Sequence, residues 1–109
     1  MDALERFGLY ADLILSTTPR PSESDRRFER MASTMIASIM ERLDGDLPSP
    51  CRLREVFDDE ERVETLLKFS DARGGDLLTL PLREYQSIYM IAELALDRFI
   101  DLTNGWRTA

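Results

Sequence analysis

The chain has 109 residues, of which 43% are hydrophobic and 32% charged, a composition typical of one folded domain and too apolar for disorder. Its 21 acidic and 14 basic residues give a net charge of −7, which argues against binding nucleic acid or anionic membranes through clustered lysine and arginine. It contains no histidine and a single cysteine, Cys51, which excludes histidine-based proton transfer, histidine metal ligands and an intrachain disulfide.

The start of the sequence and its longest uncharged run bear on where the protein works. The start, MDALER, lacks the basic region and the apolar run of a signal peptide. The longest stretch without charge, residues 31–40, is half the length that a membrane-spanning helix needs. We therefore expect a cytoplasmic protein with no membrane partner.

Residues 2–16 have the apolar spacing of a short helix. One side carries Leu4, Phe7, Ala11, Ile14 and Leu15. Leu9 and Leu13 share the opposite side, where residues four apart stack on one surface. A helix that is apolar on two sides usually has neighbours on both. We expect this helix to be buried on two sides within a bundle, and we also regard Leu9 and Leu13 as candidates for a partner contact.

Residues 17–24 (TTPRPSES) predict a linker, because two prolines and four hydroxyl residues disfavour a helix. A long helix is expected over residues 25–43, with Ser22 and Asp25 as its start signal and Asp44-Gly45 as its stop. Its apolar side consists of Phe28, Met31, Ala32, Met35, Ile36, Ile39, Met40 and Leu43, opposite Arg26, Arg27, Arg30, Ser33, Thr34, Glu41 and Arg42. Methionines are frequent on adaptable binding surfaces, but at helical spacing we expect Met31, Met35 and Met40 in the core.

Shorter elements are expected in the middle of the chain. Ser49 and Pro50 predict the cap and first position of a helix that continues over residues 52–57. Asp58 predicts the cap of a second helix, although one continuous helix remains an alternative. The expected buried side chains are Leu53, Val56, Phe57, Val63, Leu66 and Leu67. Residues 72–75 (ARGG) break the chain, and residues 76–80 (DLLTL) form either the approach to the last helix or a brief strand.

The longest periodic segment is residues 81–104, on which the rest of the chain is expected to pack. Pro81 suits a first helical position, and Asn104-Gly105 tolerate the left-handed conformation that ends helices. With ~100° between successive residues, apolar side chains fill about half of the circumference. They are Tyr85, Ile88, Tyr89, Ile91, Ala92, Ala95, Leu96, Phe99, Ile100 and Leu102.

Met90 and Leu94 interrupt the polar side of this segment. They are four residues apart and lie on one surface, next to Asp97 and Arg98. Either another helix of the same chain covers them or a second molecule does. In the second case, Met90, Leu94, Asp97 and Arg98 belong to an interface with a copy of the chain or with a different protein.

Residues that could support catalysis or bind a cofactor are scarce. No phosphate-binding glycine loop is present, the chain has one lysine, Lys68, and we expect neither an enzyme nor a cofactor. The acidic run at residues 58–61 lacks the spacing of a calcium loop and predicts a helix start instead. Direct contact with nucleic acid is disfavoured, because the last long helix carries more acids than arginines.

Together these patterns predict an all-α protein, a bundle of four to five helices in which residues 25–43 and 81–104 form a long antiparallel pair. We expect a homodimeric regulatory protein that inhibits or sequesters a partner protein. The chain is similar in size and charge to small acidic antiactivators of bacterial transcription regulators, which makes a transcription regulator a candidate partner. The alternatives are an adaptor or secretion-type chaperone and an acidic mimic of nucleic acid.

Overall fold

The computed structural model describes residues 3–16, 23–43, 47–70 and 74–103. Within these ranges the chain forms six helices and no strand, which confirms the all-α class with more helices than the four to five expected. The helices are α1 (Ala3–Leu15), α2 (Glu23–Arg42), α3 (Pro50–Val56), α4 (Glu60–Lys68), α5 (Gly74–Leu77) and α6 (Leu82–Thr103). None of the described helices is long and apolar enough to cross a membrane.

Helix α2 is the centre of the bundle, because α1, α4, α5 and α6 all pack against it. Met35, Ile36, Ile39 and Met40 are fully or almost fully buried, and Met31 is partly buried, as expected of core residues. The expectation that Ser33 faces water is wrong. Ser33 is buried against α1, where its hydroxyl donates a hydrogen bond to Asp12. Small residues on this helix therefore let neighbouring helices approach from more than one side.

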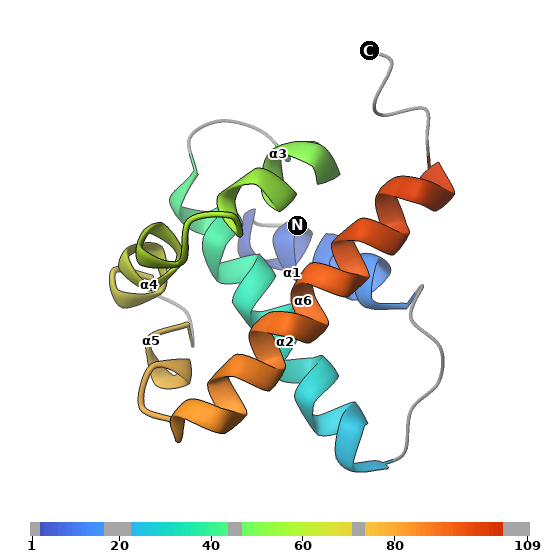
Figure 1. Ribbon diagram of the computed structural model, residues 1–109. Coiled ribbons are helices and arrows are strands. Elements are labelled where there is room, and N and C mark those ends of the chain that lie inside the picture. Colours follow the sequence, from blue (N-terminus) through green and yellow to red (C-terminus); the bar gives the residue numbers. More distant parts are fainter. Residues whose placement is uncertain (1–2, 17–22, 44–46, 71–73, 104–109) are drawn as a thin grey trace.

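The two long helices pack on each other but do not run antiparallel. Figure 1 shows α6 crossing over α2 instead of running alongside it, so the expected antiparallel arrangement of the two helices is wrong. The side of α6 that meets the core carries Ile88, Tyr89, Ala92, Ala95, Leu96 and Phe99. Leu102, which the spacing placed on the same side, is 66% exposed. A crossing contact is centred on part of each helix and leaves the ends of α6 less covered.

The middle of the chain forms two short helices, α3 and α4, with separate caps. Ser49 caps α3, with Pro50 at its start, as predicted. The cap of α4 is Asp59, whose side chain accepts the backbone N–H of Arg62; the prediction of Asp58 is wrong by one residue. Leu53, Val56, Phe57, Val63 and Leu67 are buried, and Leu66 is partly buried.

The residues before α6 also differ from the prediction in detail. Gly74 and Gly75 do not break the chain but begin the short helix α5, and the expected strand alternative for residues 76–80 is not observed. Pro81 precedes α6 and accepts the N–H of Tyr85 through its carbonyl. Helix α2 begins at Glu23, two residues earlier than predicted. Residues 17–22 of the predicted linker, which include Ser22, lie outside the described residues. The same holds for the two predicted helix stops, Asp44-Gly45 and Asn104-Gly105.

Candidate functional site

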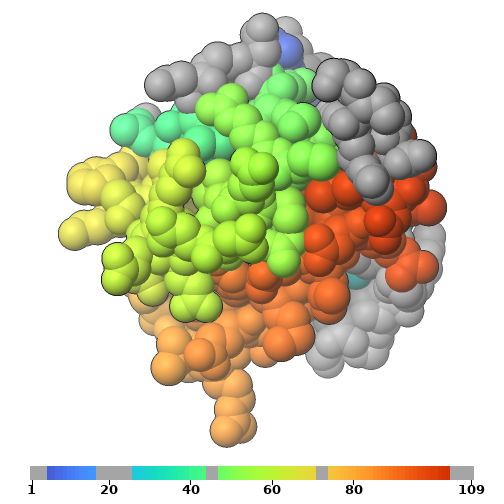
Figure 2. Space-filling view, turned by 45° about the horizontal axis from the view of Figure 1, so that its top comes forward, coloured from blue at the N-terminus to red at the C-terminus, as the bar shows by residue number. Residues whose placement is uncertain are grey.

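Helix α6 has an uncovered apolar surface on the side away from the core. Met90 and Leu94 are 59% and 58% exposed, so the interpretation that another helix of the chain covers them is wrong. Figure 2 shows α3 lying against α6 while part of α6 remains at the surface beside it. We call this region the α6 face and define it by Met90 and Leu94 with the flanking Asp97 and Arg98. It satisfies the basic requirement of an interface, because its apolar side chains are accessible.

Helix α1 carries a second apolar pair with the same spacing. Leu9 is 57% exposed and Leu13 is 54% exposed, whereas Ala11, Ile14 and Leu15 on the other side of the helix are buried. The expected burial of α1 on two sides is therefore wrong. The sequence placed Leu9 and Leu13 correctly as a pair apart from the core, and the structure leaves that pair open to solvent.

Asp97 and Arg98, the charged neighbours on the α6 face, have different surroundings. Asp97 Oδ1 accepts a hydrogen bond from Arg54 Nε at 2.9 Å, which ties this carboxylate to α3. Arg98 is exposed, and no ion pair to it is found among the described residues. Asp97 is therefore held in place at the edge of the face, whereas the charge of Arg98 is available to another molecule.

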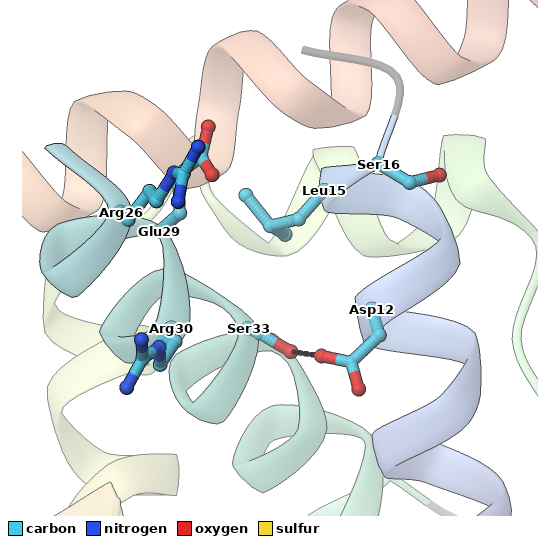
Figure 3. Close-up of a pocket in the computed structure, with 7 residues that line it drawn as sticks. All are labelled: Asp12, Leu15, Ser16, Arg26, Glu29, Arg30 and Ser33. Atoms are coloured by element: carbon cyan, nitrogen blue, oxygen red, sulfur yellow. Dashed lines mark hydrogen bonds between the residues drawn. The ribbon is translucent and has the colours of Figure 1, made fainter. Parts of the chain in front are cut away.

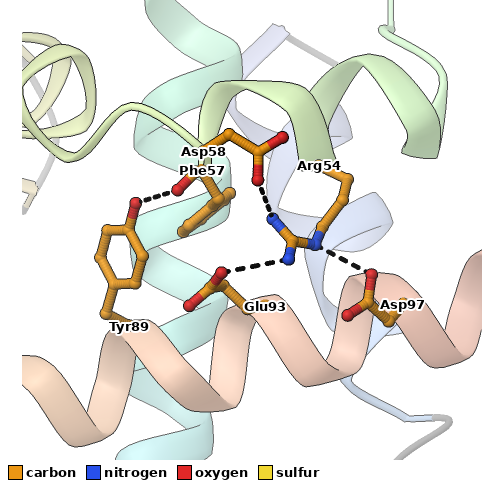
Figure 4. Close-up of polar contacts among 6 residues, drawn as sticks. All are labelled: Arg54, Phe57, Asp58, Tyr89, Glu93 and Asp97. Carbon is orange, nitrogen blue, oxygen red and sulfur yellow. Dashed lines mark hydrogen bonds and ion pairs between the residues drawn. The ribbon is translucent and has the colours of Figure 1, made fainter.

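The most connected polar group is Arg54, which the sequence analysis did not single out. Its guanidinium forms ion pairs with Asp58 at 3.0 Å, Glu93 at 3.2 Å and Asp97 at 2.9 Å. Figure 4 shows this single side chain of α3 placed between the carboxylate of Asp58, in the turn that follows α3, and two carboxylates of α6. Two sequence signals were present, the i,i+4 spacings of Arg54–Asp58 and Glu93–Asp97, but neither shows that the two helices meet.

The electrostatics of this cluster are not balanced. Burial lowers the pKa of Arg54, but the hydrogen bond and charge of Asp97, with the charges of Glu93 and Asp58, outweigh burial and raise it. Burial raises the pKa of Glu93, and the nearby carboxylates raise it further against the opposing effect of Arg54. One guanidinium therefore does not fully compensate three carboxylates, and Glu93 is the least favourably placed of them.

An aromatic contact beside Arg54 completes the joint between α3 and α6. The hydroxyl of Tyr89 donates a hydrogen bond to the carbonyl oxygen of Phe57, and the two rings lie edge to face at 5.0 Å. Burial raises the pKa of Tyr89 above its ordinary value, so the hydroxyl stays protonated as a donor. This joint holds α3 against α6 beside the α6 face, and Asp97 belongs to both.

The acidic run at residues 58–61 has structural roles. Asp58 pairs with Arg54, and Asp59 caps α4, while Glu60 and Glu61 lie in the first turn of α4. Acids in a first turn complement the helix dipole. Across the described ranges, no cluster of three or more Cys, Asp or Glu residues could hold a metal ion.

A shallow hollow lies between α1 and α2 (Figure 3). It has a volume of about 250 Å³ and is lined by Asp12, Leu15, Ser16, Arg26, Glu29, Arg30 and Ser33. Ser33 Oγ donates to Asp12 Oδ1 at 2.6 Å, so these two polar groups satisfy each other. The lining mixes both signs of charge, and it does not define the charge of a ligand.

Comparisons with known proteins add no identification to this geometry. No family model, curated protein or solved structure matches the chain. The α6 face and the Leu9–Leu13 pair are therefore the features on which a function can be argued.

Proposed function

We propose that the protein is a stoichiometric regulator that inhibits or sequesters a partner protein, in the manner of an antiactivator, and that it works in the cytoplasm as a homodimer. The observation that supports this proposal is the exposure of two apolar pairs, Met90–Leu94 on α6 and Leu9–Leu13 on α1. Both pairs have the i,i+4 spacing by which a helix face docks on another protein. A role without catalysis agrees with a sequence that has no histidine and a single lysine.

The free energy gained by covering one apolar pair is too small to hold a partner protein by itself. Full burial of a leucine or methionine contributes about 1.5–3 kcal/mol, so covering one pair that is already partly buried contributes about 2–4 kcal/mol. Loss of translational and rotational freedom on association costs at least about 4 kcal/mol. Each pair is therefore an anchor within a larger contact, and polar neighbours such as Asp97 and Arg98 must provide additional contacts and orientation.

The test is affinity capture from a lysate of the source cells with three variants of the tagged protein. Leu94→Asp places a charge on the α6 face, and Leu13→Asp places one on the α1 pair. Phe69→Asp is the matched control, because Phe69 is 58% exposed but lies at the end of α4, on neither face. Since all three side chains are exposed, all three variants should keep the helical circular dichroism of the wild type.

The proposal expects the wild type and Phe69→Asp to retain the same captured protein, and Leu13→Asp or Leu94→Asp to lose it. A captured set of unfolded or secreted chains would favour the adaptor or chaperone alternative. Capture that is equal in all three variants would contradict a role for the apolar pairs.

A further inference from the structure

The exposed side of α6 contains a longer pattern than the apolar pair. Arg83, Ser87, Met90, Leu94, Asp97 and Asp101 follow one another at steps of four, three, four, three and four residues. This is the 3.5-residue repeat by which two helices pack along a common seam. Ser87 is partly buried and the other five are exposed, so the row lies on the side of α6 away from the core, with Asp97 at its edge bonded to Arg54 of α3. We call these six residues the α6 seam.

When the α6 seam is aligned with a copy of itself that runs in the opposite direction, apolar residues lie opposite apolar residues, and the two end residues have opposite charges. Counted from Ala92, Met90 and Leu94 lie two positions away on either side, and Ser87 and Asp97 lie five away. Arg83 and Asp101 lie nine positions away on either side and have opposite charges. Ala92 itself faces the core and only marks the midpoint along the helix axis. If a second copy of α6 runs antiparallel with the two midpoints at the same level, each apolar residue meets an apolar one and each Arg83 meets an Asp101.

We infer that the α6 seam binds a second copy of the same chain in an antiparallel arrangement about a twofold axis near Ala92. This inference rests on the proposed function: it identifies a second copy of the chain as the molecule that covers the α6 face, and it leaves the Leu9–Leu13 pair on α1 for the partner protein. A twofold interface uses the same patch on both copies, as this seam requires. Met90 of each copy packs against Leu94 of the other, with an ion pair between Arg83 and Asp101 at each end.

The charges select the direction of the second helix. In a parallel arrangement, Arg83 would face Arg83, and Asp97 and Asp101 would face their own copies, so that every charged layer would be repulsive. In the antiparallel arrangement only the Asp97 layer lacks an opposite charge, and there it meets Ser87. The hydroxyl of Ser87 donates to the carbonyl oxygen of Arg83 at 3.0 Å, and the Oδ1 atom of Asp97 accepts from Arg54, so both residues have partners within their own chain and this layer is not repulsive.

The monomer leaves the end charges available for this contact. No ion pair of Arg83 or Asp101 is found within the described part of the chain. Because the apolar centre of the seam is only two residues per copy, we expect a weak dimer, with a dissociation constant on the order of 1–100 µM.

Sedimentation equilibrium of charge-exchanged variants tests the arrangement. Arg83→Asp places two aspartates opposite each other at both ends of the seam, and Asp101→Arg does the same with two arginines. Each single variant is expected to weaken the dimer by about tenfold or more. The double variant Arg83→Asp/Asp101→Arg restores opposite charges at both ends and should restore the wild-type dissociation constant. Circular dichroism of each variant verifies that it is folded.

Two results would overturn the seam. One is a wild type that is monomeric at every concentration up to millimolar. The other is a double variant no tighter than the single ones, since a parallel or unrelated interface has no reason to recover. If the dimer fails these tests while Leu13→Asp still removes the captured partner, the seam is wrong and the proposed binding of a partner protein stands without it. If the charge-exchanged variants behave as expected but no partner is captured, the antiparallel dimer is supported and the proposed function is not.

Discussion

At Arg54, one guanidinium connects α3 to two carboxylates on α6 and to Asp58 in the turn that follows α3. Its side chain is only one-quarter exposed, while its partners reach further into water. Such a network is worth more than isolated surface pairs, which contribute about 0.2–1 kcal/mol each, but less than a fully buried one. Removing the guanidinium also leaves Glu93 and Asp97 to repel each other across one turn of α6.

We therefore expect Arg54→Met, which keeps most of the side-chain volume, to lower the free energy of unfolding by about 1–2 kcal/mol. Urea unfolding in low salt measures the change. Arg52→Met is the control, because Arg52 is exposed on the same helix and makes no ion pair within the described residues. Equal stability of the two variants would contradict the role of Arg54 as the joint between α3 and α6.

Two tyrosines one turn apart on α6 provide a matched comparison. The hydroxyl of Tyr89 donates to the carbonyl of Phe57, whereas the buried hydroxyl of Tyr85 has no hydrogen-bond partner among the residues that the structure describes. Burial raises the pKa of Tyr85 to about 12, so this hydroxyl is also protonated near neutral pH. Tyr89→Phe should cost about 1 kcal/mol by leaving the Phe57 carbonyl without its donor, while Tyr85→Phe should be neutral or stabilising. Thermal unfolding of the two variants checks the order, and the reverse order would refute these assignments.

Glu93 gives the protein a specific dependence on pH. Its pKa is raised in the folded state, mainly by burial, above the ordinary value of 4.5. The stability that protonated Glu93 contributes is fully present below 4.5 and is lost as the pH rises through the folded-state pKa. Relative to wild type, Glu93→Gln should therefore become more stable as the pH rises from about 4 to about 7. Urea midpoints of both proteins at the two pH values measure this; a relative stability that falls with rising pH would have the wrong sign.

At the scale of the elements, α5 depends on a close approach to α2 and α4. A Cβ atom on Gly74 would lie 2.7 Å from the Cβ and Oγ atoms of Ser38 and 3.1 Å from a methyl group of Leu67. A Cβ on Gly75 would meet only the Leu67 carbonyl, at 3.7 Å, which is ordinary contact. We expect Gly74→Ala to cost about 1–3 kcal/mol through overpacking. Gly75→Ala should be neutral or stabilise by up to about 1 kcal/mol.

Chemical unfolding of these two glycine variants is the measurement. It separates crowding from the general effect of alanine on helix stability, because both positions are in α5. A Gly74→Ala protein as stable as Gly75→Ala would show that α5 does not pack tightly on Ser38.

The elements that the sequence predicted well are those set by short-range spacing. The repeats in α1, α2 and α6 identified the helices, and they separated Leu9, Leu13, Met90 and Leu94 from the core. Ser49 was identified as a cap because a cap needs only its own helix. The cap of α4 was misplaced by one residue, because Asp58 and Asp59 are adjacent residues of the same type: Asp58 pairs with Arg54, and Asp59 caps α4.

The packing of helices is not set by short-range spacing. Periodicity indicates which side of a helix is buried but does not give the angle at which two helices cross, so the crossing of α2 and α6 was missed. The exposure of Leu102 follows from that crossing as well. The Arg54 cluster required knowing that α3 lies on α6, and no spacing within either helix contains this information.

At the scale of the whole molecule, the burial of α2 determines what the outer helices expose. In a protein of 109 residues, the helices around a single central helix have one side against it and one side against solvent. Polar residues on the outer sides of α1 and α6 would serve a monomer adequately. The apolar pairs found there instead support a second role for these sides, in contacts between molecules.

Methionine oxidation measured at several protein concentrations tests this account most directly. Met90 is exposed, whereas Met35 and Met40 are fully or almost fully buried, so a dilute sample treated briefly with peroxide should be oxidised at Met90 well before Met35 and Met40. Raising the protein concentration, or adding a captured partner, should slow the oxidation of Met90 and leave the rates at Met35 and Met40 unchanged. If Met90 is as protected as Met35 in the most dilute sample, its own chain covers it. If it oxidises equally fast at every concentration and with the partner present, no other molecule covers it; either result contradicts the account.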